Sequence, residues 1–215
     1  MPFTVQYAVP MTCEDCTKSI KKALDNVEGV ENVDFDLEKK LVTIRGESAP
    51  SQIVSAMRGI GRDAIVRGSG RPNSAAVCIL ENAQGKTRGL VRFIEDEEHQ
   101  IIIDCTVAPT TPQAQQVSIH ASGDMSQGAM STGEKLYTLG MTSKFGDVFS
   151  LITRQSLPLM NTIGRSVVVG PPSGPTTESL AGVIARSAGL WENDKVVCSC
   201  TGMTLWEERK VATTV

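Results

Sequence analysis

The spacing of apolar residues changes abruptly at a short polar segment, residues 68–74, which reads GSGRPNS. Before this segment, apolar residues recur at intervals of two in some stretches and of three to four in others, which indicates strands and amphipathic helices. After it, short β-rich runs are separated by Gly, Pro and Ser turns. Because the segment has the composition of a linker, we expect two domains of different class.

The first domain, residues 1–68, predicts an α+β ferredoxin-like sandwich. Two stretches have the i, i+3, i+4, i+7 spacing of an amphipathic helix, one beginning just after Cys13 and the other at Pro50. Alternating apolar residues predict four strands, at residues 4–9, 33–37, 41–45 and 62–67. The resulting order of elements is βαββαβ.

The second domain, residues 75–190 after a linker at 69–74, predicts an all-β sandwich or barrel. Its β-rich runs lie at residues 75–80, 89–94, 101–107, 116–121, 166–169 and 182–185. From residue 191 to residue 215 the periodicity is lost, so we expect an irregular C-terminal arm.

Charge and hydropathy exclude several functions. The net charge is −3, which implies no broad attraction to nucleic acid or to an anionic membrane. No apolar run approaches the ~18 residues that a membrane span requires, so we expect no membrane insertion. The N-terminal residues lack the basic and apolar regions of a secretory signal. We therefore expect a soluble protein of the cytoplasm.

The cysteines suggest metal or redox chemistry rather than a disulfide scaffold. Two of the six, Cys78 and Cys105, lie in strand-like runs, where a buried thiol acts as a small apolar side chain. The other four form two close pairs, Cys13 with Cys16 and Cys198 with Cys200. In a reducing compartment, a close pair of cysteines indicates metal binding or thiol exchange.

The first pair suits Cu(I). This soft ion accepts two thiolates in near-linear geometry, whereas zinc requires four ligands, so zinc is not expected. Cysteines three residues apart at the start of a helix can turn both sulfurs toward one point. The exposed N–H groups of the helix N-terminus also favour the thiolate form. A C-x-x-C pair alone is shared with redox proteins and zinc ribbons.

The segment M-T-C-x-x-C at residues 11–16, which opens the first helix of a βαββαβ unit, resembles the heavy-metal-associated domain of copper metallochaperones. The resemblance implies that Cys13 and Cys16 are Cu(I) ligands and that Met11 packs beneath the loop. It also implies that Arg62 lies near the metal and offsets the anionic thiolates, the alternative being a solvated arginine.

The second domain resembles Cu/Zn superoxide dismutase in four segments, which occur in that family's order: residues 76–80, 118–124, 163–169 and 182–185. The resemblance implies a Greek-key barrel. The metal sites of that family need several histidines, whereas this chain has two, His99 and His120. Ser118 and Gly170 stand where copper histidines are expected. We therefore expect no dismutase activity and a structural role for His120.

Other departures concern the zinc loop and the disulfide of that family. Lys135 stands where the first zinc histidine is expected, and Ala129 replaces a disulfide cysteine. A barrel that keeps the dismutase fold without its metal ligands can serve as a docking domain. The two-fold interface of a dimer is self-complementary, so a chain that copies this interface can replace one subunit of the dismutase dimer. The resemblance implies that the docking residues are Gly123, Ile163, Gly164, Ile184 and Arg186.

The second thiol pair, Cys198-Ser199-Cys200, resembles the C-terminal arm of copper chaperones for Cu/Zn superoxide dismutase. In an extended strand, residues two apart face opposite sides, so a shared ligand requires a turn. We expect Cys198 and Cys200 to bind Cu(I) or to exchange disulfides with a client cysteine.

The leading hypothesis is a copper chaperone that receives Cu(I) from an upstream donor and forms a heterodimer with Cu/Zn superoxide dismutase. It also promotes the client's intrasubunit disulfide. The resemblance implies a homodimer through the same barrel edge and a second pool in the mitochondrial intermembrane space. The alternatives are an active dismutase with a fused copper domain, a general thiol oxidoreductase, and a Cu(I)-binding protein without a dismutase client.

Overall fold

A computed structural model describes residues 2–108, 113–145 and 147–190 of the chain. Cys198, Cys200 and the rest of the predicted arm lie outside the described residues. The chain divides into two compact units, which are described separately. Among described residues, the first unit holds 2–75 together with 94–99 and 187–190, and the second holds 76–93 and 100–186.

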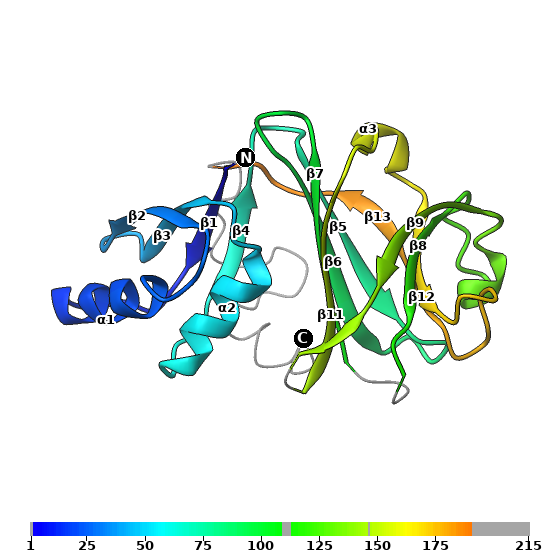
Figure 1. The fold of residues 1–215 in the computed structure, drawn as a ribbon, viewed down its shortest axis with the longest axis horizontal. Coiled ribbons are helices and arrows are strands. Elements are labelled where there is room, and N and C mark those ends of the chain that lie inside the picture. The colour runs from blue at the N-terminus through cyan, green and yellow to red at the C-terminus, as the bar shows by residue number, and fades with distance from the viewer. Residues whose placement is uncertain (1, 109–112, 146, 191–215) are drawn as a thin grey trace. The chain divides into compact units, whose positions relative to one another are not determined.

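The first unit has the ferredoxin-like fold that the sequence predicts. Its four strands are in the spatial order β2-β3-β1-β4, and its helices alternate with them along the chain (Figure 1). The elements are β1 (Phe3–Ala8), α1 (Glu14–Leu24), β2 (Val30–Asp36), β3 (Leu41–Gly46), α2 (Pro50–Gly59) and β4 (Ile65–Ser69).

The last strand begins later than predicted, at Ile65 instead of residue 62. Gly61 has φ of +71°, and the amide of Arg62 donates to the carbonyl oxygen of Met57 at 3.0 Å. These residues therefore complete the C-terminal turn of α2, as a glycine in the left-handed region commonly does.

Alternation along β1 places Val5 and Tyr7 in the core of this unit, where both are buried. The helices contribute fully buried side chains at the predicted helical spacing, among them Ile20, Leu24 and Ile53. Burial of each such side chain contributes roughly 1.5–3 kcal/mol. The apolar side chains of the helices and of the sheet therefore pack in one core.

The segment predicted as a linker is packed, not free. Ser69 belongs to β4, and the amide of Gly70 donates to the carbonyl oxygen of Thr4 at 2.9 Å. The hydroxyl of Ser74 donates to the carbonyl oxygen of Arg71 at 2.7 Å. These bonds satisfy backbone groups that a solvated linker would leave to water. The predicted domain boundary itself stays a prediction.

The second unit is an all-antiparallel barrel, as predicted. Its sheet has the order β10-β11-β7-β6-β5-β13-β12-β8-β9. The strands are β5 (Ala75–Glu81), β6 (Thr87–Glu95), β7 (Ile101–Val107), β8 (Gln116–His120), β9 (Lys135–Met141), β10 (Ser143–Phe145), β11 (Val148–Gln155), β12 (Ser166–Gly170) and β13 (Leu180–Arg186). Because β9 and β10 are consecutive in the chain but lie at opposite ends of this order, the sheet curls into a nearly closed barrel (Figure 1).

Three strands, β9, β10 and β11, were not predicted. In β9 the outward-facing residues include the exposed apolar side chains of Leu136 and Met141, so polar and apolar residues do not alternate. Its core side is supplied by Leu139 and the partly buried Tyr137. Tertiary packing thus overrides a weak periodic signal.

Both remaining described cysteines lie in the barrel core. Cys78 and Cys105 are fully buried among side chains such as Leu80, Phe93 and Ile103. Burial raises the pKa of the Cys78 thiol to about 12 and raises the pKa of Cys105 as well. Their burial confirms the prediction that both thiols act as small apolar side chains of the core.

Two short helices complete the barrel unit, a 3₁₀ helix η1 (Gly128–Ser131) and α3 (Leu159–Thr162). Among the described residues, no helix combines the length and the apolar character that crossing a bilayer would demand.

Candidate metal centre

The first thiol pair lies at the start of α1. Cys13 is the N-cap of this helix, with extended backbone at φ −158° and ψ 170°, and its side chain caps no backbone group. Its thiol is therefore left available, and it is exposed, while Cys16 is partly buried. Glu14 and Asp15 place negative charge in the first turn, where the helix dipole favours it.

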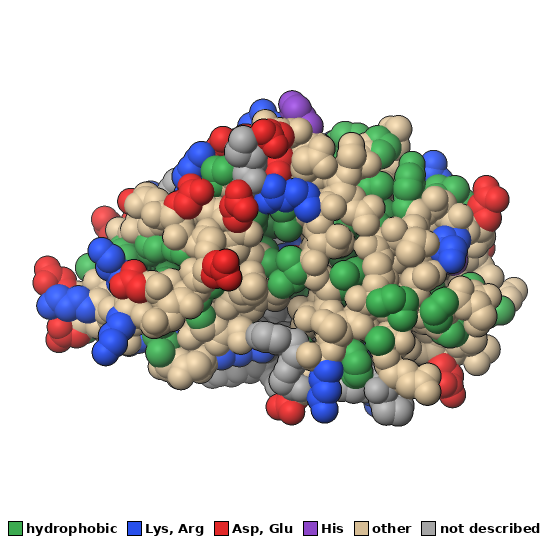
Figure 2. Space-filling view, in the orientation of Figure 1, with side chains coloured by type: hydrophobic (Ala, Val, Ile, Leu, Met, Phe, Trp, Pro, Cys, Tyr) green, Lys and Arg blue, Asp and Glu red, His purple; other side chains and the backbone are tan. Residues whose placement is uncertain are grey.

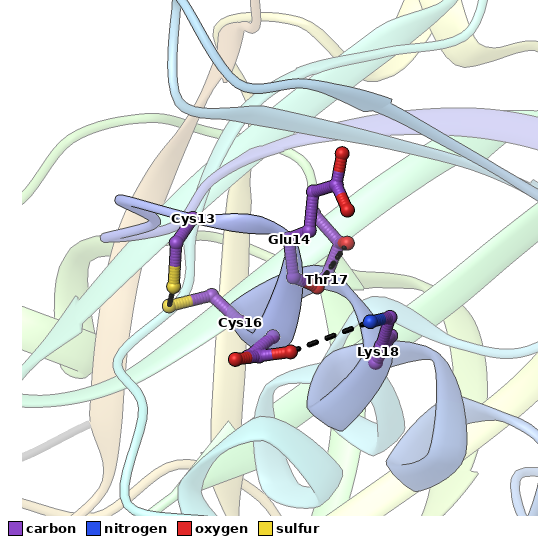
Figure 3. Close-up of polar contacts among 6 residues, drawn as sticks. Cys13, Glu14, Cys16, Thr17 and Lys18 are labelled. Carbon is purple, nitrogen blue, oxygen red and sulfur yellow. Dashed lines mark hydrogen bonds and ion pairs between the residues drawn. The ribbon is translucent and has the colours of Figure 1, made fainter.

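The two sulfurs point toward each other, with the Sγ atoms of Cys13 and Cys16 3.5 Å apart (Figure 3). The hydroxyl oxygen of Thr12 lies 3.8 Å from the sulfur of Cys16. The rest of the turn is held by Thr17, whose hydroxyl donates to the carbonyl oxygen of Glu14 at 2.7 Å. Local helix geometry therefore brings both thiols to one point.

The surroundings of Cys16 lower the pKa of its thiol. A hydrogen bond from the backbone of Thr12 lowers its pKa most, followed by contacts with the Cys13 side chain and the Thr12 hydroxyl, and the pKa falls to about 6. Hydrogen bonds to the anion favour the charged form. The lowered pKa favours the thiolate form of Cys16 before a metal ion binds.

This arrangement fits a two-coordinate soft cation. A metal–thiolate bond is about 2.3 Å long, so a linear site requires the sulfurs to be about 4.6 Å apart. The exposed side chain of Cys13 can supply this opening of about 1 Å by rotation. Because the site is at the surface, an incoming thiolate can approach the bound ion.

Two supporting residues were predicted beside this pair. Met11 is 1% exposed and therefore buried, which fits packing beneath the loop. Arg62 is half-buried, and its guanidinium donates to the carbonyl oxygen of Pro10 at 2.8 Å. The arginine therefore contacts the backbone that leads into the metal loop. The structure records no bond from Arg62 to either sulfur.

In the barrel, His120 is buried and hydrogen-bonded through both ring nitrogens. Nδ1 lies 3.0 Å from the carbonyl oxygen of Gly133 and 3.0 Å from the hydroxyl of Thr132. A carbonyl only accepts, so Nδ1 carries the proton, and Nε2 accepts from the hydroxyl of Ser118 at 3.1 Å. Burial lowers the pKa of this imidazole.

These contacts fit the structural role predicted for His120. Its neighbours also lack ligand character: Ser118 replaces one expected histidine, and Lys135 donates to the amide oxygen of Gln116 at 2.9 Å. In the described ranges, no group of three or more His, Cys, Asp or Glu side chains could hold a metal ion.

Three of the predicted docking residues meet at one edge of the barrel. The amide of Gly164 donates to the carbonyl oxygen of Ile184 at 2.9 Å. A Cβ atom on Gly123 would lie 2.2 Å from the carbonyl oxygen of Gly164, so these two backbones are in direct contact. Ile163 is half-buried beside them, and Arg186 is exposed at the end of β13.

One of these predictions needs correction, because the side chain of Ile184 is 1% exposed and belongs to the barrel core. In β13 the register pairs Ile184 with Cys78, whose side chain also faces inward. Alternation along the strand instead turns Val183 and Ala185 outward. Counting from the buried Leu180 would have revealed this from the sequence.

The structure adds two outward apolar residues that sequence reasoning missed, Val183 at 39% exposed and Ile79 at 53% exposed. A Cβ atom on Gly182 would lie 1.9 Å from the carbonyl oxygen of Ile79, so the two strands are in close contact there. On the face drawn in Figure 2, charged side chains gather over the N-terminal unit and few lie over the barrel. Exposed apolar side chains such as Val183 and Ile79 are typical of the core of a protein interface.

Comparison with known proteins gives the same assignment for the first unit. The family model described as the heavy-metal-associated domain matches residues 6–63. This segment contains the whole of α1 with Cys13 and Cys16, and all of β2, β3 and α2.

Three curated relatives align with nearly the whole chain. The superoxide dismutase 1 copper chaperone of Candida glabrata is 41% identical over 227 residues, which cover 98% of this chain and 95% of the relative. Its namesake from Saccharomyces cerevisiae is 40% identical, with 98% and 95% covered. The copper chaperone for superoxide dismutase from Homo sapiens is 32% identical, with 96% and 89% covered.

Proposed function

Because the chain belongs to the family of copper chaperones for superoxide dismutase, we propose that it carries Cu(I) on Cys13 and Cys16 and delivers it to a Cu/Zn superoxide dismutase. The observation that carries this proposal is the exposed thiol pair, 3.5 Å apart, in which Cys16 has a lowered pKa. The named relatives are chaperones and not enzymes. The chain is accordingly a metallochaperone without catalytic turnover of its own.

Ligand exchange explains how such a site releases its cargo. The two thiolates hold Cu(I) tightly, but two-coordination leaves the ion open to a third sulfur. An incoming thiolate adds to the metal, and one of the original thiolates then leaves, so the copper stays in the Cu(I) state. The same exchange with an upstream donor loads the site. Neither direction requires an oxidant.

Heterodimer docking is the second part of the proposal. The surface formed by Gly123, Gly164, Val183 and Ile79 includes residues of the neighbouring strands β5 and β13 and exposes the apolar side chains of Val183 and Ile79. We propose that a dismutase subunit binds this surface, with Arg186 at its rim. A two-fold interface is self-complementary, so the same surface would also support a homodimer.

The third part concerns Cys198 and Cys200, which lie outside the described residues. We propose that this pair, as two thiolates, accepts Cu(I). In its second role, an oxidant such as dioxygen first converts the pair to a Cys198–Cys200 disulfide. A client cysteine then attacks this disulfide and a second client cysteine resolves the mixed disulfide, so the client gains its intrasubunit disulfide and the pair returns to two thiols. A cytoplasmic location is consistent with thiols that must be reduced when they bind Cu(I). The sequence resemblance extends this proposal to a pool in the mitochondrial intermembrane space.

One experiment tests the central claim. The full chain and a Cys13→Ser/Cys16→Ser variant are titrated with Cu(I) against a chromogenic competitor, with Ser19→Ala on the exposed side of α1 as the matched control. The double variant should lose one copper equivalent while the control loses none. Equal stoichiometry in all three proteins would refute the role of this pair.

A further inference from the structure

The four-stranded sheet of the first unit has one face covered by α1 and α2 (Figure 1). Alternation in β1 turns Val5 and Tyr7 toward the core, so Gln6 lies on the opposite face. The register pairs Gln6 with Thr43 of β3 and with Gly68 of β4, which places all three on that face. We call these three residues together with Ala8 the open face.

Three of the four residues of the open face are buried, and Thr43 is partly exposed. Gln6 is 3% exposed, and among the described residues its Nε2 atom has no hydrogen-bond partner. Ala8 is buried as well. Burying an amide donor without a partner costs about 1–3 kcal/mol. A segment that supplies an acceptor to the Gln6 amide would remove this cost.

The chain itself returns to this face after the last barrel strand. A Cβ atom on Gly68 would lie 2.2 Å from the carbonyl oxygen of Gly189, so the Gly189 backbone occupies the space above Gly68. The amide of Ser69 donates to the carbonyl oxygen of Ala188 at 3.2 Å. The amide of Leu190 donates to the carbonyl oxygen of Gly70 at 3.1 Å. The described chain therefore ends at the rim of the open face.

We propose that residues 191–200 of the same chain dock on the open face and supply an acceptor to Gln6. Directly beyond Leu190, the eight residues to Cys198 can span about 26–29 Å when extended. The six residues of β1 are about 20 Å long, so this segment can cross the strand from end to end.

The chemistry of the segment fits the surface it would cover. Its sequence, WENDKVVCSC, offers Trp191 and two valines for apolar contact and many backbone carbonyls as acceptors for Gln6.

Docking would give the second thiol pair a fixed place on the N-terminal unit. This consequence rests on the proposed function, because it takes Cys198 and Cys200 as working thiols. The docking itself does not, since it depends only on the open face and on the segment that follows Leu190.

Hydrogen–deuterium exchange on the full chain tests the proposal. Amides in 191–200 should exchange at least about tenfold more slowly than those of an unstructured peptide. Gly68→Ala should abolish this protection, because the new Cβ would displace the Gly189 backbone. Gly59→Ala is the matched control, since no atom lies within 4 Å of a Cβ at that position. Unprotected amides in the wild type, or protection that survives Gly68→Ala, would overturn the proposal.

A second measurement does not depend on the folding of Gly68→Ala. The photocrosslinker p-benzoylphenylalanine is introduced in place of Thr43 on the open face, and in place of Ser19 on the exposed side of α1 as a control. Only the first should crosslink to 191–200, and crosslinks solely to other segments would contradict docking. Cu(I) stoichiometry is measured on every variant, so failed docking and failed copper binding remain distinguishable.

Discussion

Ala129 of η1 and Ala181 of β13 belong to one small buried cluster, which Val168 of β12 completes. Ala129 stands where the sequence resemblance to superoxide dismutase expects a disulfide cysteine. At that place, apolar packing joins η1 to β12 and β13.

The first prediction follows from this proximity. An Ala129→Cys/Ala181→Cys variant should form a disulfide on oxidation and gain about 2–4 kcal/mol of stability, because a crosslink restricts the unfolded chain. Peptide mapping by mass spectrometry detects the bond, and urea denaturation measures the gain. The two single variants are the controls. Failure of the pair to crosslink would mean that the two positions are not close enough for a disulfide.

The second prediction concerns the reactivity of Cys16. Its lowered pKa predicts that alkylation by iodoacetamide, followed by mass spectrometry of the metal-free protein, rises with a midpoint near pH 6. Thr12→Val removes the hydroxyl contact but keeps the backbone hydrogen bond, so the midpoint should move up only in part. Thr17→Val, on the same turn, is the control and should leave the midpoint unchanged. A midpoint near the ordinary cysteine value of about 8.5 would rule out the pre-formed thiolate.

The third prediction is a pH dependence that arises from His120. Burial holds its folded-state pKa below the unfolded value of about 6.5, so the unfolded chain binds the proton more readily. The stabilisation is therefore present above pH 6.5 and is lost as the pH falls through 6.5 toward the folded pKa. His120→Gln should flatten this dependence in urea denaturation followed by circular dichroism. An unchanged slope in the variant would show that another group is responsible.

The fourth prediction concerns the outward-facing residues of β13, whose substitution should affect binding to dismutase. Val183→Lys should weaken the complex with metal-free dismutase at least about tenfold, because a charge is buried without a partner. Ile152→Lys, at a residue of β11 that is similarly exposed, is the control and should bind normally. Complex formation is measured by analytical ultracentrifugation. Equal loss in both variants would argue against this edge as the docking surface.

Ile184→Ala provides the complementary case. Because this side chain is buried in the barrel core, truncation should cost about 2–5 kcal/mol of unfolding free energy through the cavity it leaves. Its binding to dismutase, measured well below the unfolding transition, should stay close to that of the wild type. Strong loss of binding with full stability would restore Ile184 to the interface.

Local features of the fold and site were predictable from the sequence. The βαββαβ order, the position of Cys13 and Cys16 at the start of α1, and the burial of Cys78 and Cys105 all follow from spacing over a few residues. The shortage of histidines already argued against a dismutase centre. The predictions that failed were those that depended on strand register or on exposed apolar side chains, as at Ile184 and in β9.

By itself, the amino-acid sequence determined which residues could be copper ligands and which class each unit would adopt, because helix and strand periodicity are short-range properties. Only the tertiary structure decided that β9 and β10 lie at opposite ends of one sheet, that Ile184 faces inward, and that the backbone of Gly189 lies over Gly68. These relationships join residues far apart in the chain. Packing of the whole unit selects them, and no local pattern carries that information.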